Sequence, residues 1–230
     1  MKRFTLPSLA IIFAVTAIVS PLRAQDASDE VKRAREAAVV LEEIMGAADK
    51  GIPTAVLEKA EGVAVFPGLL KGGLGIGGQH GRGVLSVRDR KTGGWSNPGF
   101  LTINGGSIGA QIGLQSTDLV LVINNLRGLE QLVKNQFKLG ADAAVAAGPV
   151  GRDASAATDI QMRAQILSYS RSRGLFAGVT LNGSTINQDR DANERFYGKP
   201  YTTSQIVFDG MGSNEAANEW KATLAKYARD

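Results

Sequence analysis

Ile108-Gly-Ala-Gln-Ile-Gly-Leu-Gln115 is the stretch that decides the fold, because its residues alternate strictly between two kinds. Aliphatic side chains or alanine occupy the even-numbered positions, and glycine or glutamine occupies the odd-numbered ones. A period of two predicts a β-strand with one apolar face. Sixteen of the chain's 28 glycines lie between Gly62 and Gly113, so the predicted sheet is rich in glycine.

Further strands are predicted on both sides of this stretch, where short segments are apolar or alternating. They are Gly62–Phe66, Val84–Arg88, Leu119–Ile123, Leu175–Leu181 and Ile206–Phe208. Lys91–Gly94 and Asn97–Gly99 carry the glycine and proline signals of turns between strands.

Helices are predicted at both ends of the chain and in its middle. From Asp29 to about Lys50, apolar residues recur every three or four positions, as in an amphipathic helix. Further helices are predicted over Thr54–Ala60, Leu126–Leu139 and Asn214–Arg229. Strands in the middle with helices around them predict a single α+β domain. We expect a mainly antiparallel, glycine-rich sheet, twisted or barrel-like, flanked by N-terminal, middle and C-terminal helices.

The first 24 residues have the pattern of a cleaved secretory signal peptide. Lys2 and Arg3 provide the positive start, and Leu9–Val19 provides the apolar core. This core is shorter than the roughly 20 apolar residues that span a bilayer, which disfavours an uncleaved membrane anchor. We therefore expect residues 1–24 to be removed, residues 25–230 to form the domain, and the protein to be periplasmic or secreted.

Removal of residues 1–24 changes the charge of the chain. The segment holds three basic residues and no acidic ones, so the formal net charge falls from +4 to +1. Nucleic-acid binding needs a basic surface that neutralises phosphates, and it is disfavoured by this balance. Attraction to an anionic surface has to come from a local group of Arg and Lys side chains.

Two literal matches to catalytic motifs lie in the glycine-rich region. Gly105–Gly109 fits G-x-S-x-G with Ser107 as the nucleophile, but that motif needs a following helix and a later histidine. The single histidine, His80, comes earlier, and a strand pattern follows Ser107. Gly73–Gly78 fits the nucleotide-binding G-x-G-x-x-G, which also has to open a helix and is instead followed by a strand pattern. No catalytic residue is predicted, and a serine hydrolase is kept only as a minor alternative.

One segment begins like a calcium-binding loop, at Asp189-Arg-Asp191-Ala-Asn193. Glu194 stands where that loop needs glycine, and Pro200 stands where it needs an acidic residue. With one histidine and no cysteine, the chain also lacks the usual ligands of zinc. Neither a metal nor a cofactor is predicted.

Several longer strings are distinctive: Ala146–Arg152, Ser168–Gly178, Ala192–Gly198, Gly68–Gly83, Trp95–Phe100 and Thr117–Val122. Through them the chain closely resembles the SYLF domain family from about Ile52 to Phe208. Eukaryotic members of this family bind phosphoinositide-containing membranes, and fungal members also bind actin filaments and their regulators. Bacterial members are mostly exported. The resemblance implies an exported bacterial member that binds lipid and carries out no reaction.

In this family, membrane attachment is associated with a basic surface and with the N-terminal helix. The basic residues in or beside the family strings are therefore the candidate headgroup-binding residues: Lys71, Arg82, Arg152, Arg171 and Arg173. A guanidinium group suits phosphate because its planar fork donates two hydrogen bonds at once. The alternative for each arginine is an ion pair with Asp118, Asp142 or Asp153 that holds a loop in place.

The predicted helix over residues 29–50 differs from a strong membrane binder, because it is rich in alanine, lacks Trp and Phe, and balances its bases with acids. We expect it to pack on the domain's own sheet or on a partner helix. The sequence therefore predicts a non-enzymatic module of the bacterial cell envelope whose partner is an anionic phospholipid or membrane surface. The alternative is an envelope structural or protein-interaction domain without lipid binding.

Overall fold

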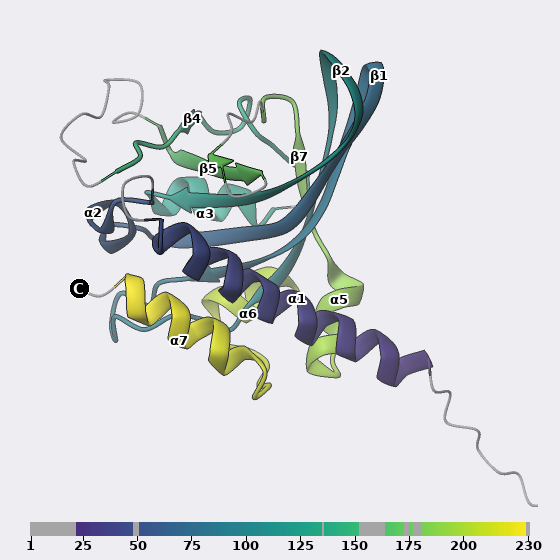
Figure 1. The fold of residues 1–230 in the computed structure, drawn as a ribbon. Helices are drawn as coiled ribbons and strands as arrows, with labels where there is room; N and C mark the ends of the chain where they lie inside the picture. Colours follow the sequence, from purple (N-terminus) through teal and green to yellow (C-terminus); the bar gives the residue numbers. More distant parts are fainter. Residues whose placement is uncertain are drawn as a thin grey trace, which may run out of the picture.

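The computed structural model describes residues 22–47, 51–134, 136–151, 164–172, 175–176 and 181–228. Its helices are α1 (Leu22–Met45), α2 (Thr54–Glu58), α3 (Leu126–Leu132), α5 (Arg190–Tyr197), α6 (Thr203–Phe208) and α7 (Ala217–Tyr227). Its strands are β1 (Gly62–Val87), β2 (Gly99–Ile123), β3 (Phe137–Lys138), β4 (Val145–Ala147), β5 (Ile166–Ser172), β6 (Leu175–Phe176) and β7 (Thr185–Gln188) (Figure 1).

Two very long strands form the centre of the fold. β1 and β2 pair antiparallel from Gly62 opposite Ile123 to Leu85 opposite Gly99, with two shifts of register on the way. The short segments predicted within residues 62–123 are pieces of these two strands, whose ladder continues through the intervening glycines. The predicted turns lie in the connecting loop, where the backbone N–H of Gly93 donates to the carbonyl oxygen of Asp89 at 2.8 Å.

The β1–β2 ribbon curls until its base closes on itself. The backbone N–H of Arg88, just after β1, donates to the carbonyl oxygen of Glu61, just before β1, at 2.8 Å. The backbone N–H of Glu61 donates in turn to the carbonyl oxygen of Ile123 at 2.9 Å. The middle of the ribbon projects beyond the rest of the molecule, at the top of Figure 1.

Two glycines allow this curl. A side chain at Gly83 would collide with the carbonyl oxygen of Val65 and with the ring of Phe66. A side chain at Gly81 would lie 2.8 Å from a methyl group of Leu69. The second half of β1 therefore packs directly on the first half, which is a close backbone approach that strand glycines permit.

The shorter strands complete a seven-stranded sheet in the described part of the chain. β5 pairs with one end of β2, at Asp118–Ile123, and β7 pairs with the other end, at Leu101–Asn104. β3 adds to β7 and β6 adds to β5, all antiparallel, and only β4 runs parallel to its neighbour β5. The predicted α+β class with a mainly antiparallel, barrel-like sheet is confirmed.

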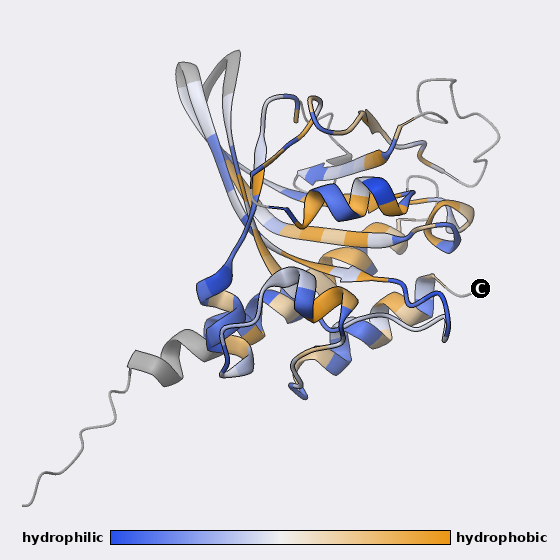
Figure 2. Ribbon diagram, turned by 180° about the vertical axis from the view of Figure 1, so that it is seen from behind, coloured by the Kyte–Doolittle hydropathy of each residue, from blue (hydrophilic) through white to orange (hydrophobic). Residues whose placement is uncertain are grey.

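The curled sheet has a hydrophobic core on each face. On one face, Val63, Val65, Val84 and Val122 pack with the buried sides of α1, α5 and α7, including Trp220. On the other face, Phe66, Leu69 and Leu85 pack with α3 and α6. α1 lies beside α7 and crosses β1 (Figure 1), which confirms that the N-terminal helix packs on its own domain. In Figure 2 the hydrophobic colours gather on the strands and on the helix sides that face them.

Some predicted elements differ from the structure. Ile206–Phe208, predicted as a strand, is the end of α6, because Thr202 and Gln205 form a capping box that starts a helix just before these residues. The helix predicted to run to Leu139 ends at Leu132, and Phe137–Lys138 is strand. The loop-like segment after Asp189 is helix α5, whose first turn Asp189 caps by accepting a hydrogen bond from the N–H of Ala192.

The boundaries of other predictions fall partly outside the described residues. The predicted signal peptide lies almost wholly within residues 1–21, which are outside them, and α1 begins at Leu22. α1 ends at Met45, and residues 48–50 are again outside. Of the strand predicted over Leu175–Leu181, Leu175–Phe176 is β6, and residues 177–180 are outside.

Candidate functional site

The structure describes three of the five predicted headgroup-binding residues, and these three do not form one cluster. Lys71 and Arg82 lie on β1, and Arg171 lies near the end of β5. Arg152 and Arg173 lie outside the described residues. The three cations that the structure places differ in surroundings, and each has to be considered separately.

Arg171 forms ion pairs with two acidic residues. Its Nη2 contacts Oε2 of Glu43 on α1 and lies 3.9 Å from Oδ2 of Asp118, its cross-strand partner. Asp118 in turn accepts a hydrogen bond from the backbone N–H of Gly68 at 2.9 Å. The Arg171 side chain is only 17% exposed. This is the pairing expected of an arginine that holds elements together, here α1, β2 and β5.

Arg82 lies between two inward-facing glycines. Gly81 and Gly83 face Leu69 and Phe66 inside the curl, and successive side chains of a strand point to opposite faces. Arg82 therefore lies on the outer face of the ribbon, the face that carries the helices nearer its base. The residue is exposed, and no ion pair joins it to any residue that the structure describes.

Beside Arg82, the outer face carries other polar groups. Arg82 is paired in register with Thr102, and His80 is paired with Asn104. The His80 ring nitrogen Nδ1 lies 2.7 Å from Oδ1 of Asn104, at an exposed position. These groups are hydrogen-bonding surface and contain no nucleophile with a base beside it.

Lys71 lies on the inner face of the ribbon. Leu69, two residues earlier, is buried inside the curl. Residues two apart on a strand share a face, so Lys71 lies on the same face as Leu69, with Gln115 as its cross-strand partner. Partial burial lowers the pKa of the Lys71 ammonium below its usual value, because desolvation disfavours the charged form. The structure therefore separates Lys71 from Arg82 by the thickness of the ribbon.

The same region carries an exposed apolar pair that the sequence did not single out. Leu114 is 80% exposed and Leu70 is 45% exposed. Leu70 pairs with Ser116 and Gly72 pairs with Leu114, so the two leucines are diagonal neighbours on one face. That face is the outer one, which Arg82 also occupies. Strand periodicity assigned Leu114 to the apolar face of its strand, but the sequence does not show where a sheet runs beyond its helices.

A buried ionic network, also missed from the sequence, ties α1 to α5. Arg33 Nη2 lies 2.8 Å from Oε2 of Glu30, and Arg33 Nη1 lies 3.0 Å from Oδ2 of Asp189. Arg195 Nη2 lies 2.7 Å from the other oxygen of Glu30. The Arg33 guanidinium also lies over the ring of Phe100, 5.3 Å from its centroid. The clue in the sequence was the run of charges at the start of the predicted N-terminal helix.

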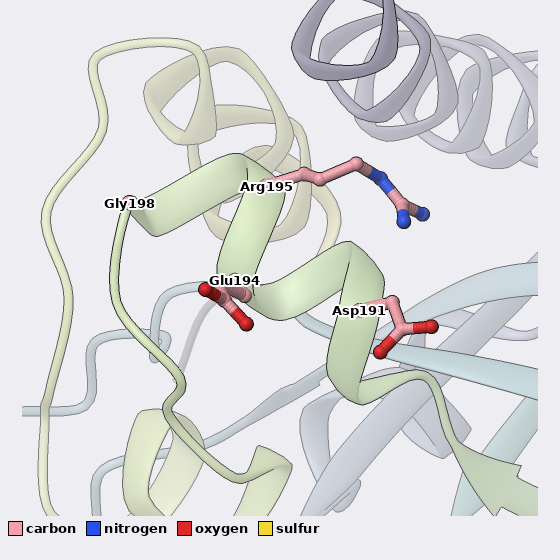
Figure 3. A pocket seen from close by; sticks show the side chains of 4 residues that line it. All are labelled: Asp191, Glu194, Arg195 and Gly198. Atoms are coloured by element: carbon pink, nitrogen blue, oxygen red, sulfur yellow. The ribbon is translucent and has the colours of Figure 1, made fainter. Parts of the chain in front are cut away.

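A pocket of about 530 Å³ lies against α5 (Figure 3). It is lined by Asp191, Glu194, Arg195 and Gly198. Its cation, Arg195, is held by Glu30, as described above. The described lining therefore presents two carboxylates and an arginine that is already paired, and it includes neither Lys71, Arg82 nor Arg171.

The catalytic motifs lie within strands. Ser107 is part of β2, opposite Gly77 of β1, so no helix follows it as a nucleophile turn requires. The glycines of Gly73–Gly78 belong to β1 in the same ladder. In the described part of the chain, no three His, Asp or Glu side chains gather in a way that would hold a metal ion. None of its helices has both the length and the apolar character to cross a membrane.

Comparison with known proteins identifies the family. Residues 104–227, more than half of the chain, match the family model "Ysc84: Las17-binding protein actin regulator". The chain is 37% identical over 163 residues to LAS seventeen-binding protein 3 of Saccharomyces cerevisiae. The aligned region covers 70% of this chain and 35% of the yeast protein. It is 35% identical over 161 residues to human SH3 domain-containing YSC84-like protein 1, covering 70% of this chain and 46% of the human protein.

The chain thus spans between about a third and a half of the length of the curated relatives it matches. The matched residues include most of β2, the strands and helices that follow it, and the cap of α5. On this match the chain belongs to the Ysc84 family, the SYLF domain family, whose members are generally non-catalytic.

Proposed function

We propose that this protein is a non-enzymatic lipid- or membrane-surface-binding module of the bacterial cell envelope that contacts anionic headgroups through Arg and Lys. The observation that carries the proposal is Arg82, exposed on the outer face of the projecting ribbon and without an ion pair to any described residue. An arginine in this state keeps both arms of its guanidinium available for phosphate.

The three placed cations have different parts in this proposal. Arg82 is the main headgroup contact. Lys71, partly desolvated, is a weaker point-charge contact at the inner side of the same ribbon. Arg171 acts indirectly, since its charge is already neutralised by Glu43 and Asp118, and it keeps α1 on the sheet. Because the net charge of residues 25–230 is only +1, this local arrangement has to provide the attraction.

The place in the cell is part of the proposal and rests on sequence alone. Lys2, Arg3 and the apolar segment Leu9–Val19 support export and a periplasmic or secreted location. Measurement of the N-terminal residue of protein recovered from the periplasm tests this directly. A chain that begins at Gln25 supports export, and a chain that keeps Met1 in the cytoplasm contradicts it.

Vesicle flotation tests the lipid-binding proposal. Protein comprising residues 25–230 is expected to float with phosphatidylcholine vesicles that contain phosphatidylglycerol and to stay behind with phosphatidylcholine alone. Arg82→Ala is expected to lower the bound fraction, and Arg82→Lys to restore part of it, because lysine keeps the charge but loses the planar fork. Added salt is expected to weaken binding, since exposed charges are screened within about 10 Å at 0.1 M salt.

Arg90→Ala is the matched control. Arg90, on the hairpin loop, is also exposed, but it forms an ion pair with Glu61. It is expected to float like the wild type. If the wild type binds to none of the anionic lipid mixtures, the proposal is contradicted.

A protein partner is the second candidate function, and two observations favour it. Relatives carry names that refer to binding of Las17, which is a statement about those proteins. In this chain Phe208, the last residue of α6, and Met211, three residues later, are both exposed. If this candidate is right, a partner captured by the wild type is retained by Arg82→Ala and lost by Phe208→Asp, without any requirement for lipid.

A further inference from the structure

The projecting part of the β1–β2 ribbon contains no ionisable residue over two long stretches. Gly72–Gln79 on β1 and Asn104–Thr117 on β2 contain no Asp, Glu, Lys, Arg or His. Within them the register pairs Leu74 with Ile112 and Ile76 with Ile108. Both backbone pairs belong to the middle of the ribbon, which projects beyond the rest of the molecule in Figure 1.

Two described side chains in or beside this region are apolar and open to solvent. Leu114 and Leu70 lie on the outer face at 80% and 45% exposure. They lie on adjacent strands, so the exposed area is continuous and not a single stray side chain. Exposed apolar patches on projecting elements mark sites of protein or membrane contact.

The charges around the region favour a membrane over a protein partner. Lys71 directly follows Leu70, and Arg82 lies further along the same strand, beyond the uncharged stretch. The uncharged stretch of β1 has Lys71 at one end and His80 followed by Arg82 at the other, while the nearest acid on β2, Asp118, is paired with Arg171. An uncharged apolar end with cations at its base matches a bilayer, in which hydrocarbon lies beneath anionic headgroups.

The depth of contact is limited by the backbone. β5 and β7 pair with β2 only at its two ends, so β2 has no strand neighbour other than β1 from Gly105 to Thr117 in the described pairing. Unpaired N–H and C=O groups are costly in hydrocarbon. The ribbon edge therefore has to remain among the headgroups and their water, while side chains reach the acyl boundary.

We infer that the end of the β1–β2 ribbon is a membrane-insertion element, with Leu70 and Leu114 entering the acyl boundary and Lys71 and Arg82 at the headgroups. This inference rests on the membrane-binding function proposed above. It adds that binding has an apolar component located in a strand ribbon, and that the N-terminal helix stays packed on the domain.

A fluorescent label reports insertion directly, and the chain has no cysteine to compete for it. Leu114→Cys carrying an environment-sensitive dye is expected to shift its emission to the blue when phosphatidylglycerol vesicles are added. Its emission is also expected to be quenched by lipids that carry a quencher on the acyl chain. Ala222→Cys, an exposed position on α7 away from the ribbon, is the matched control and is expected to show neither effect.

Substitution tests the energetic contribution. Leu70→Asp combined with Leu114→Asp is expected to lower the vesicle partition coefficient about tenfold or more, because two apolar side chains no longer leave water and charges are added. Val39→Asp is the control, since Val39 is equally apolar and 47% exposed but lies on α1. Unchanged urea midpoints in both variants show that the fold is retained.

The outcomes separate the two proposals. If the wild type floats but the label at position 114 stays in water, insertion is overturned and headgroup binding stands. If the wild type does not float at all, both are overturned. If the label is shielded without vesicles in a way that depends on protein concentration, the ribbon end is a contact between copies of the chain and insertion is overturned.

Discussion

At the scale of single residues, the structure assigns glycine a packing role. Gly83 lies against the carbonyl oxygen of Val65 and the Phe66 ring, at a place where two halves of one strand touch. Gly106, in the same ribbon, has no atom within 4 Å of the position that a side chain would occupy. Glycines that look equivalent in the sequence therefore differ in what they contribute.

Gly83→Ala is expected to lower the free energy of unfolding by about 1–3 kcal/mol, the cost of forcing a methyl group into packed atoms. Gly106→Ala is expected to be neutral or to stabilise by up to about 1 kcal/mol, because it only restricts the unfolded chain. Urea denaturation of the two variants measures both values. Equal destabilisation by the two substitutions would show that the curl does not depend on close contact at Gly83.

Tyr169, which is buried, and Tyr197, which is partly buried, make stability sensitive to alkaline pH. Burial raises the pKa of Tyr169 and of Tyr197 well above the usual value of about 10. Above that pH the unfolded chain releases protons that the folded chain retains, so the free energy of unfolding falls as pH rises. Each tyrosine is expected to contribute a slope of about 1.4 kcal/mol per pH unit.

Phenylalanine substitutions separate the two tyrosines. The Tyr197 hydroxyl donates to the carbonyl oxygen of Pro98 at 2.7 Å, whereas the buried Tyr169 hydroxyl has no hydrogen-bond partner among the described residues. Tyr197→Phe is expected to cost about 1 kcal/mol at pH 7, and Tyr169→Phe close to nothing. Both are expected to reduce the alkaline slope, measured from urea midpoints between neutral pH and pH values above about 10. An unchanged slope would contradict the burial of these hydroxyls.

At the scale of elements, sequence patterns located the sheet and the outer helices but missed their extents. β1 and β2 were predicted as short pieces because glycine interrupts the apolar alternation while leaving the backbone ladder intact. The strand predicted over Ile206–Phe208 was wrong. β-Branched and aromatic residues favour strands, but the capping box at Thr202 outweighed that preference and started a helix. α5 was missed because its cap, Asp189, is equally typical of a loop.

The contact between α1 and α5 depends on Arg33, whose two buried partners come from different elements. Arg33→Ala is expected to destabilise the protein by about 3–5 kcal/mol, because Glu30 and Asp189 lose their shared counter-charge in a buried place. Lys32→Ala is the adjacent control. Lys32 is 72% exposed, and its ion pair within the described part of the chain is with Glu36, so the expected change is within about 0.5 kcal/mol. Similar urea midpoints for the two variants would contradict a structural role for the network.

At the scale of the whole molecule, α1 forms part of one hydrophobic core. Its buried residues Ala37, Leu41 and Ile44 belong to the same cluster as Trp220 and the strand valines. The small alanines that disfavoured membrane binding in the sequence are what allow the helix to lie close to β1 and α7. The sequence could predict this packing but not the separation of the basic residues onto two faces, since that follows from the curl of the ribbon.

A chain that begins at Gly51 is expected to lose cooperative unfolding, because removal of α1 exposes the part of one core face that α1 covers. Binding of the dye ANS and the sharpness of the urea transition measure this. Full-length protein carrying Arg171→Ala is the milder comparison, since it loses ion pairs of α1 but keeps its apolar contacts. A truncated chain with a sharp transition and no dye binding would show that α1 is an appendage.

The hairpin loop between β1 and β2 has a consequence for how the chain folds. Pairing can begin at Leu85 and Gly99, beside the loop, and extend residue by residue to Gly62 and Ile123, which are far apart in sequence. Both faces near the base are apolar, so a slip of one residue would exchange the two cores without exposing charge. The bonded turn from Asp89 to Gly94 therefore sets the register in which the ladder begins, and this register holds from Leu85 as far as the shift between Ile76 and Leu74.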